Sequence, residues 1–162
     1  MIWSVNEDGA SLSQGDVFDD CPILLWMAAG AGRELIERQV RVIVLTQACD
    51  LAQAKAARVT VAVIHDAQEM VSQGHLKSAL IRDQIRNHRV YGWYFLPTGP
   101  GLPESLVDLR DLHTVPRELL DELIAGGKRV ARLLTPYREH LAQHFATTYA
   151  RIALPEPFET QP

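Results

Sequence analysis

The chain has 162 residues, a length at which one hydrophobic core can serve a single domain. Hydrophobic residues make up 47% and charged residues 22%, which excludes a disordered tail, a collagen-like repeat and a coiled-coil rod. Two cysteines are too few for a disulfide scaffold or a four-cysteine zinc site. The 16 basic and 20 acidic residues give a net charge of −4, which disfavours non-specific nucleic-acid binding but leaves a local basic groove as an alternative.

The first half of the chain is dominated by β-branched residues. Val17 to Trp26 predicts a first strand with a bend at Asp19 to Pro22, because proline cannot donate a ladder hydrogen bond. Small residues from Ala28 to Gly32 predict a flexible connection. Gln39 to Thr46 carries β-branched residues on both faces, which predicts a strand buried on both sides, and Val59 to His65 predicts a further strand.

The second half adds helices and shorter strands. Apolar spacing predicts a helix over His75 to Arg86, and Pro116 opens a short helix that runs to Ile124 and ends at Gly126-Gly127. The other predicted elements are strands at Arg89 to Leu96, Ser105 to His113 and Lys128 to Leu134, and a loop at Pro97 to Pro103.

The last predicted helix carries the clearest signals. Thr135 can cap it, and Pro136 occupies its first turn. Its apolar stripe consists of Tyr137, Leu141, Phe145, Tyr149 and Ile152. This face can cover the chain's own sheet or a second copy's, so a homodimer is an alternative that periodicity does not decide.

These elements predict one α+β domain over residues 1–162, with an N-terminal arm at 1–14 and a loose tail at 155–162. We expect a small curled antiparallel sheet or an SH3-like β-barrel, with a helical insertion and a C-terminal helix. The apolar run from Pro22 to Ala31 is about half of the ~20 residues that a membrane span needs, and it follows acidic rather than basic residues. We therefore expect a cytoplasmic protein without a membrane association.

One candidate site follows the strongest predicted strand, in the segment TQACDL. Loop residues at a sheet rim are held by a rigid scaffold and can meet a ligand. Cys49 can act as a nucleophile if a histidine such as His65, His113 or His140 deprotonates its thiol. In the alternative interpretation, Cys49 is a small buried hydrophobe and Asp50 caps the following turn.

Metal and cofactor motifs are sparse. Cys21 and Cys49 have no further ligand at zinc spacing. His140 and His144 lie one helical turn apart, but Glu139 precedes them and the HExxH arrangement is absent. No glycine-rich phosphate loop or nucleophile elbow occurs either. We expect no metal and no cofactor.

The order of the elements carries a resemblance. Gly15-Asp16 precedes the first strand, Val42 to Thr46 (VIVLT) and Val59 to Ile64 (VTVAVI) follow, and Ser105 to Asp108 (SLVD) leads to a short helix, a strand and a C-terminal helix. In this order the chain resembles the PemK/MazF family of toxin ribonucleases, which are small SH3-like barrels. The resemblance implies a bacterial protein from a toxin or phage-defence system. The family has a Thr or Ser after the later strand, where this chain has His65-Asp66, so the barrel is expected to serve another use.

Three functions follow from these observations. The first is a binding or regulatory domain that holds a protein partner or small ligand at the rim around Cys49 and Asp50. The second is an endoribonuclease in which His65 moves a proton and Arg41 stabilises phosphate charge. The third is a hydrolase that depends on Cys49 as its nucleophile.

Overall fold

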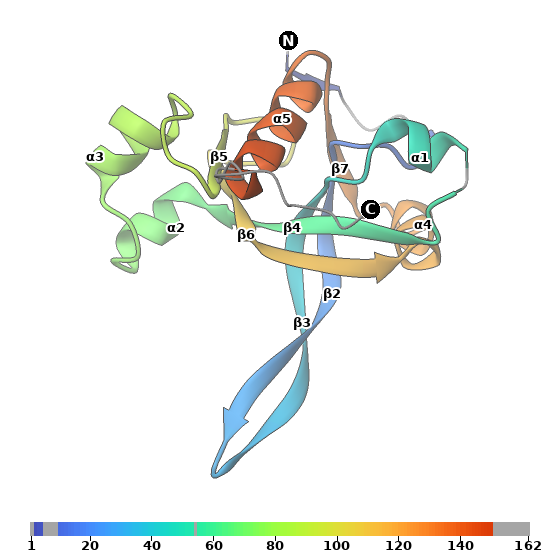
Figure 1. The fold of residues 1–162 in the computed structure, drawn as a ribbon, viewed down its shortest axis with the longest axis horizontal. Coiled ribbons are helices and arrows are strands. Elements are labelled where there is room, and N and C mark those ends of the chain that lie inside the picture. The colour runs from blue at the N-terminus through green and yellow to red at the C-terminus, as the bar shows by residue number, and fades with distance from the viewer. Residues whose placement is uncertain (1, 5–9, 54, 151–162) are drawn as a thin grey trace, which may run out of the picture.

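The structure is a computed structural model that describes residues 2–4, 10–53 and 55–150. The strands within these residues are β1 (Trp3–Ser4), β2 (Asp16–Ala29), β3 (Gly32–Val44), β4 (Arg58–Asp66), β5 (Trp93–Leu96), β6 (Ser105–Pro116) and β7 (Arg129–Leu133). The helices are α1 (Ala48–Ala52), α2 (Ala67–Ser72), α3 (Ser78–Leu80), α4 (Arg117–Ala125) and α5 (Tyr137–Tyr149), with a π-helical segment η1 (Ile81–Ile85) after α3. The chain is therefore α+β, with a helical insertion between β4 and β5 and a helix near its C-terminus, as the sequence predicts (Figure 1).

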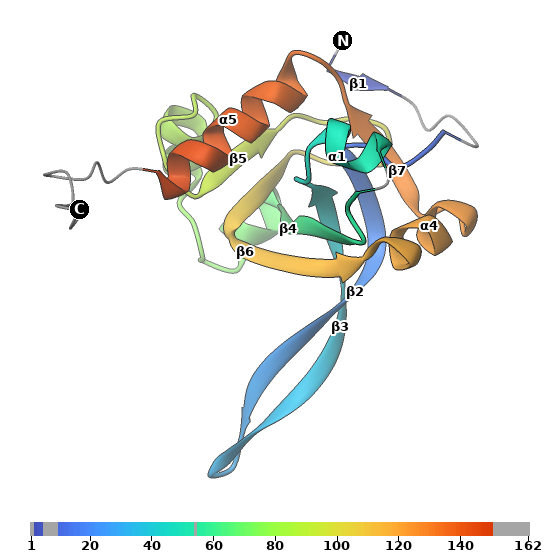
Figure 2. The same cartoon turned by 45° about the vertical axis from the view of Figure 1, so that its right-hand side comes forward.

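The described strands form one antiparallel sheet in the order β1-β7-β2-β3-β4-β6-β5. β1 and β5 are its edges, and no described residues pair these two edges, so the sheet is not closed into a barrel. Figure 2 shows how the sheet curls. A Cβ atom placed on Gly99, in the loop after β5, would lie 2.6 Å from Nε1 of Trp3 in β1. The loop that follows β5 therefore approaches β1 through a contact that only glycine permits.

Apolar side chains pack on both faces of the central strands. Ile43 of β3 belongs to a cluster that includes Leu141 of α5, whereas its neighbour Val42 packs in a cluster with Leu120 of α4. This confirms the burial on both sides that the alternation in this strand predicts. A third cluster joins the helical insertion to β5 and β6 through Ala67, Ile81, Ile85, Trp93 and Leu106.

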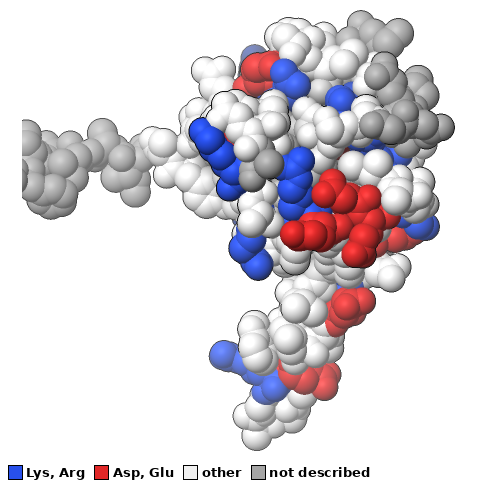
Figure 3. All heavy atoms as spheres, turned by 90° about the vertical axis from the view of Figure 1, so that its right-hand side faces the viewer, with Lys and Arg blue, Asp and Glu red and all other residues white. Residues whose placement is uncertain are grey.

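β2 and β3 form a long hairpin whose outer half projects from the body of the molecule (Figures 1 and 2). β7 pairs with residues 16–18 of β2, and β4 pairs with residues 42–44 of β3, so residues 22–39 have no second neighbour among the described strands. We call residues 22–39 the arm. Gly30 and Ala31 form its turn, in the segment that the sequence predicts to be a connection. On the face of the arm that Figure 3 displays, most of the surface belongs to uncharged residues.

The predicted bend in the first strand is a β-bulge. The register between β2 and β3 shifts between Phe18 and Cys21, and Asp20 adopts a φ of 54° there. Lys128 Nζ donates to Asp20 at 2.6 Å, which ties the bulge to the segment before β7. The bulge separates the part of the hairpin inside the body from the arm.

The helical insertion differs from its prediction. The predicted helix over His75 to Arg86 is wrong at its start, because the helix begins at Ser78 and continues as the π-helical segment. α2 precedes it as a separate helix, whose first turn is capped by Asp66 accepting from the backbone of Gln68 and Glu69. Among the described residues, no helix has both the length and the apolar character required to cross a membrane.

The buried face of α5 also differs from the predicted stripe. Leu141 is buried as predicted, but the other fully buried positions are His144 and Thr148, whereas Tyr137 and Tyr149 are exposed. The N-cap position is occupied by Pro136, and the hydroxyl of Thr135 donates to a side chain within the helix instead of capping it. Ile152 and the predicted tail at 155–162 lie outside the described residues.

The segment before β2 is anchored by a buried carboxylate. Asp16 is fully buried and accepts hydrogen bonds from the backbone of Ser13 at 2.9 Å, from Arg132 at 3.0 Å and from Arg129 at 3.3 Å. Arg129 also donates to the carbonyl of Ala10 at 2.8 Å. Residues 10–13, which lie in the N-terminal segment predicted at 1–14, are thereby held against β7.

Candidate functional site

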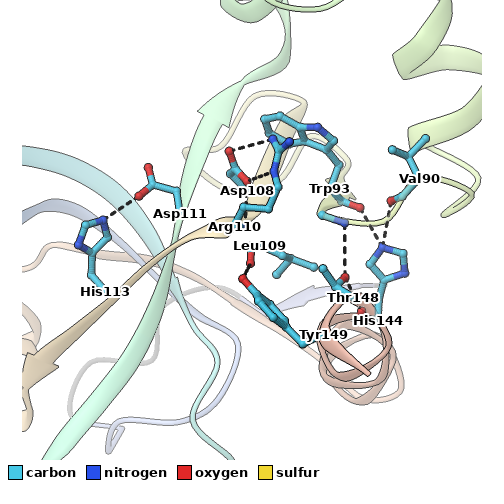
Figure 4. Close-up of polar contacts among 11 residues, drawn as sticks. Val90, Trp93, Asp108, Leu109, Arg110, Asp111, His113, His144, Thr148 and Tyr149 are labelled. Carbon is cyan, nitrogen blue, oxygen red and sulfur yellow. Dashed lines mark hydrogen bonds and ion pairs between the residues drawn. The ribbon is translucent and has the colours of Figure 1, made fainter. Parts of the chain in front are cut away.

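An irregularity in β6 shapes the candidate site. β4 pairs with β6 on both sides of residues 109–111, but these three residues have no partner in β4. Such a bulge re-aims side chains, and bulges are common beside functional sites. Leu109 is buried, whereas Arg110 is exposed and lies beside Asp108 (Figure 4). The bulge thus brings two carboxylates, Asp108 and Asp111, and one guanidinium to one edge of the sheet.

A polar cleft of about 610 Å³ opens beside this bulge. Arg38 comes from the base of the arm, His65 from the end of β4, and His75 from the connection between α2 and α3. The full lining consists of Arg38, His65, Met70, Gln73, His75, Leu76, Trp93, Asp108, Arg110 and Asp111. Segments that are far apart in the sequence therefore contribute polar side chains to one cavity.

Both carboxylates in the cleft are already paired. Arg110 donates to the two oxygens of Asp108, from Nε at 2.9 Å and from Nη2 at 3.2 Å (Figure 4). Nε2 of His113 lies 2.8 Å from Asp111 Oδ1. The guanidinium of Arg110 is 4.6 Å from the ring centroid of Trp93, an additional cation–π contact that positions it. The acidic groups of the cleft therefore already have hydrogen-bonding partners within the protein.

Three other side chains in the cleft have no ion-pair partner among the described residues: Arg38, His65 and His75. His65 makes an edge-on ring contact with Trp93 at 6.1 Å between centroids. A guanidinium binds phosphate and carboxylate oxygens strongly, and an imidazole can donate to them or transfer a proton. The unpaired groups of the cleft thus favour an anionic ligand.

Cys49 and Asp50 lie elsewhere, in α1 between β3 and β4. Both are exposed, and Cys49 Sγ lies 3.7 Å from the side-chain oxygen of Gln47 and 4.0 Å from Oδ1 of Asp50. Cys49 is therefore not the buried hydrophobe of the alternative interpretation. No described contact joins its thiol to a histidine or to any cation.

Arg41 lies in neither the cleft nor α1. Its guanidinium pairs with Asp19 and donates to the carbonyl of Gly101 at 3.3 Å. Arg41 does not line the cleft, and no described contact joins it to His65. Of the four candidate catalytic residues, the structure thus places only Cys49 and Asp50 together, and only His65 in the cleft.

His140 and His144 have separate partners rather than a shared one. Nδ1 of His140 lies 3.0 Å from the hydroxyl of Tyr94. Nε2 of His144 donates to the carbonyls of Trp93 at 3.0 Å and Val90 at 3.3 Å (Figure 4). These contacts hold α5 against β5. In the part of the chain that the structure describes, no group of three or more His, Cys, Asp and Glu side chains is arranged to hold a metal ion.

Sequence reasoning missed most of the cleft. Arg38 and Asp108 are far apart in the sequence, and nothing in their spacing connects them. The sequence predicts His75 as the start of a helix, but His75 lies in the connection between α2 and α3, which brings it to the cleft. The available signal was the run of charged residues around Leu109, which interrupts the strand alternation at the bulge.

No protein-family model matches this chain, and no curated protein matches it. The resemblance to the PemK/MazF family therefore depends on the motifs given above.

Proposed function

We propose that the protein is a small binding domain on an SH3-like, incompletely closed barrel, and that the His65 cleft binds the phosphate group of a nucleotide or a single-stranded RNA. One observation carries this proposal. The carboxylates of the cleft are paired with Arg110 and His113, whereas Arg38, His65 and His75 have no ion-pair partner among the residues that the structure describes. A phosphate satisfies such groups through charge-assisted hydrogen bonds.

The overall charge of −4 is compatible with this site. A net negative protein does not attract nucleic acid over its whole surface, so binding depends on the local cleft. Because one arginine dominates the unpaired charge, we expect a weak dependence on salt, with a slope equivalent to about one phosphate contact on the logarithmic scale.

Binding can be measured by the anisotropy of a fluorescein-labelled short single-stranded RNA. Arg38→Gln should weaken binding at least about tenfold, the effect expected for loss of a charge-assisted hydrogen bond. Arg33→Gln is the matched control, because it removes the same charge from the opposite face of the arm. Competition experiments with a nucleoside monophosphate and with inorganic phosphate show whether the cleft recognises the nucleoside as well as the phosphate. Equal losses in the two variants would mean non-specific attraction and contradict the proposal.

A second function, endoribonuclease activity, is favoured by the two imidazoles in the same cleft. In such a reaction one histidine accepts the proton of the ribose 2′-hydroxyl, whose oxygen attacks the phosphorus. The other histidine protonates the departing 5′-oxygen, which leaves a 2′,3′-cyclic phosphate and a 5′-hydroxyl. This reaction uses two histidines and needs no metal ion, so cleavage should persist in EDTA.

His65→Ala and His75→Ala should each abolish this cleavage, while RNA binding by the folded variants persists. Comparing Arg38→Gln with Arg41→Ala identifies the arginine that stabilises the phosphate. Because Arg38 lines the cleft and Arg41 does not, we expect Arg38→Gln to lose activity. Intact RNA after incubation with the wild-type protein would leave binding as the sole function of the cleft. The rim around Cys49 and Asp50 remains a separate prediction for a protein partner.

A further inference from the structure

The arm exposes large apolar side chains away from the body of the protein. Trp26 is 70% exposed, Leu24 60% and Leu35 51%. Strand pairing places all three on one face, because directly opposed residues of a hairpin share a face and alternate residues return to it. An apolar band of this kind on a projecting element is typical of an interaction surface.

The same face continues into an apolar groove at the base of the arm. The groove has a volume of about 540 Å³ and is bounded by Leu24 and Glu37 on the arm and by Val115, Pro116 and Leu119 on the body. Leu24 belongs to both the band and the groove. The chain therefore carries, on one continuous surface, both a projecting apolar element and a recess next to its base.

The charges on this face are arranged symmetrically about its centre. Three opposed pairs form the face: Leu24 with Glu37 near the base, Trp26 with Leu35 in the middle, and Ala28 with Arg33 near the tip. Leu35 is midway between Arg33 and Glu37 along β3. A rotation of 180° about an axis across the middle pair brings the tip of one arm over the base of another and sets Arg33 of each copy opposite Glu37 of the other.

We propose that this face of the arm binds a second copy of the chain, with two arms packed face to face and antiparallel about a two-fold axis. Trp26 of the two copies then meet at the axis, and Leu24 of each copy faces Ala28 of the other, where the small side chain leaves room. The tip, which contains Gly30 and Ala31, enters the groove of the other copy. Each surface is its own complement, as a two-fold interface requires.

The size of this surface indicates a weak dimer. One face of the arm and the groove provide fewer than the 20–30 residues per side that are found in standard interfaces, so we expect a dissociation constant on the order of micromolar. The ion pairs lie at the two ends of the contact, and they determine its orientation more than its strength. A membrane is a less suitable partner, because Arg33 and Glu34 stand directly after the tip, where insertion would bury them.

The test measures mass by light scattering and sedimentation over about 1 µM to 0.5 mM of the full chain, a range that brackets this affinity. The wild type should approach twice its 18.1 kDa mass as its concentration rises. Arg33→Glu and Glu37→Arg should each weaken the dimer at least about tenfold, because each places like charges together. The double variant Arg33→Glu/Glu37→Arg should restore it, and Trp26→Ser should abolish it within this range.

Glu34→Lys is the control, because it reverses a charge beside Arg33 on the opposite face of the arm, and it should leave the dimer unchanged. Far-ultraviolet circular dichroism checks that the variants are folded; all the substituted side chains are exposed. A wild type that stays monomeric throughout would overturn the proposal. So would a failure of the double variant to recover dimerisation, or an effect of Glu34→Lys as large as that of Arg33→Glu.

Discussion

The two cysteines differ sharply in their surroundings. Cys21 is fully buried in β2, and burial raises the pKa of its thiol to about 11. Cys49 is exposed in α1 beside Gln47 and Asp50, and neither neighbour is a cation that stabilises a thiolate. The thiol that the sequence singles out is therefore accessible but has no described activating partner.

We expect iodoacetamide at neutral pH to label Cys49 and to leave Cys21 unmodified in the folded protein. Mass spectrometry of the intact chain should show one added group, none in Cys49→Ser, and two after unfolding of the wild type. The rate should be that of an ordinary exposed thiol. Labelling much faster than that of a free cysteine would instead support the nucleophile hypothesis.

His88 makes the stability sensitive to acid. Its ring lies 4.6 Å from those of Tyr94 and His140, and its Nδ1 is buried without a hydrogen-bond partner among the described residues. Burial, with the nearby His140 and His144 as smaller causes, lowers the pKa of His88 to about 4. The unfolded imidazole has a pKa of ~6.5, so the stabilisation is present above that value and is lost as the pH falls towards 4.

Between pH 7 and pH 5, His88 should therefore cost the wild type about 1 kcal/mol of unfolding free energy, less than the full pKa shift would give because part of the ring faces solvent. His88→Asn removes the titration and keeps a side chain that tolerates the φ of 55° at this position. Urea unfolding at the two pH values measures the difference. The same pH dependence in wild type and variant would contradict this role.

At the scale of elements, β-branched alternation and glycine or proline punctuation predicted most of the sheet. The strand predicted at Val59 to His65 lies wholly within β4, whereas the strands predicted at Gln39 to Thr46 and Lys128 to Leu134 extend past the end of β3 by two residues and past each end of β7 by one. Gly126 follows the last residue of α4, as expected. The face of α5 could not be predicted in this way. The helical spacing is compatible both with the predicted aromatic stripe and with the face that is buried. His144 lies on the buried face because its ring donates to the carbonyls of Val90 and Trp93, in and just before β5. Such tertiary partners leave no periodic signal.

The ion cluster around Asp16 should be important for holding β2 against β7. Asp16→Asn would remove the charge of the fully buried carboxylate that both Arg129 and Arg132 contact. Breaking buried ion pairs of this kind costs about 3–5 kcal/mol. Denaturant unfolding should show this loss. The control Asp83→Asn breaks an exposed pair with Arg82 and should leave the midpoint unchanged. Equal effects would contradict a structural role for the buried cluster.

At the scale of the whole molecule, the candidate site was less predictable than the sheet. His65 was identified from the sequence, but its neighbours in the cleft come from the arm, the helical insertion and β6. The bulge at residues 109–111 decides where Asp108 and Asp111 lie, and local propensity gives no register for it. A site assembled across segments in this way depends on the order of the strands in the sheet, which the sequence pattern does not give.

The arm and the body should be separable. Ile23 and Arg38 are directly opposed in the hairpin, so residues 24–37 can be replaced by Asn-Gly, the sequence that favours a two-residue turn with the twist of the flanking strands. None of the deleted residues is fully buried. The shortened protein should therefore unfold within about 1 kcal/mol of the wild type, since its core clusters are intact.

This shortened protein also separates the two proposals. It lacks Trp26, Arg33 and Glu37, so it should sediment as a monomer at every concentration tested. It retains Arg38 and the rest of the cleft lining, so its affinity for the labelled RNA should stay within about twofold of the wild type. Loss of RNA binding together with dimerisation would show that the ligand site spans two copies. Binding that persists in the monomer would place the complete phosphate site within one chain, with the arm serving only association between copies.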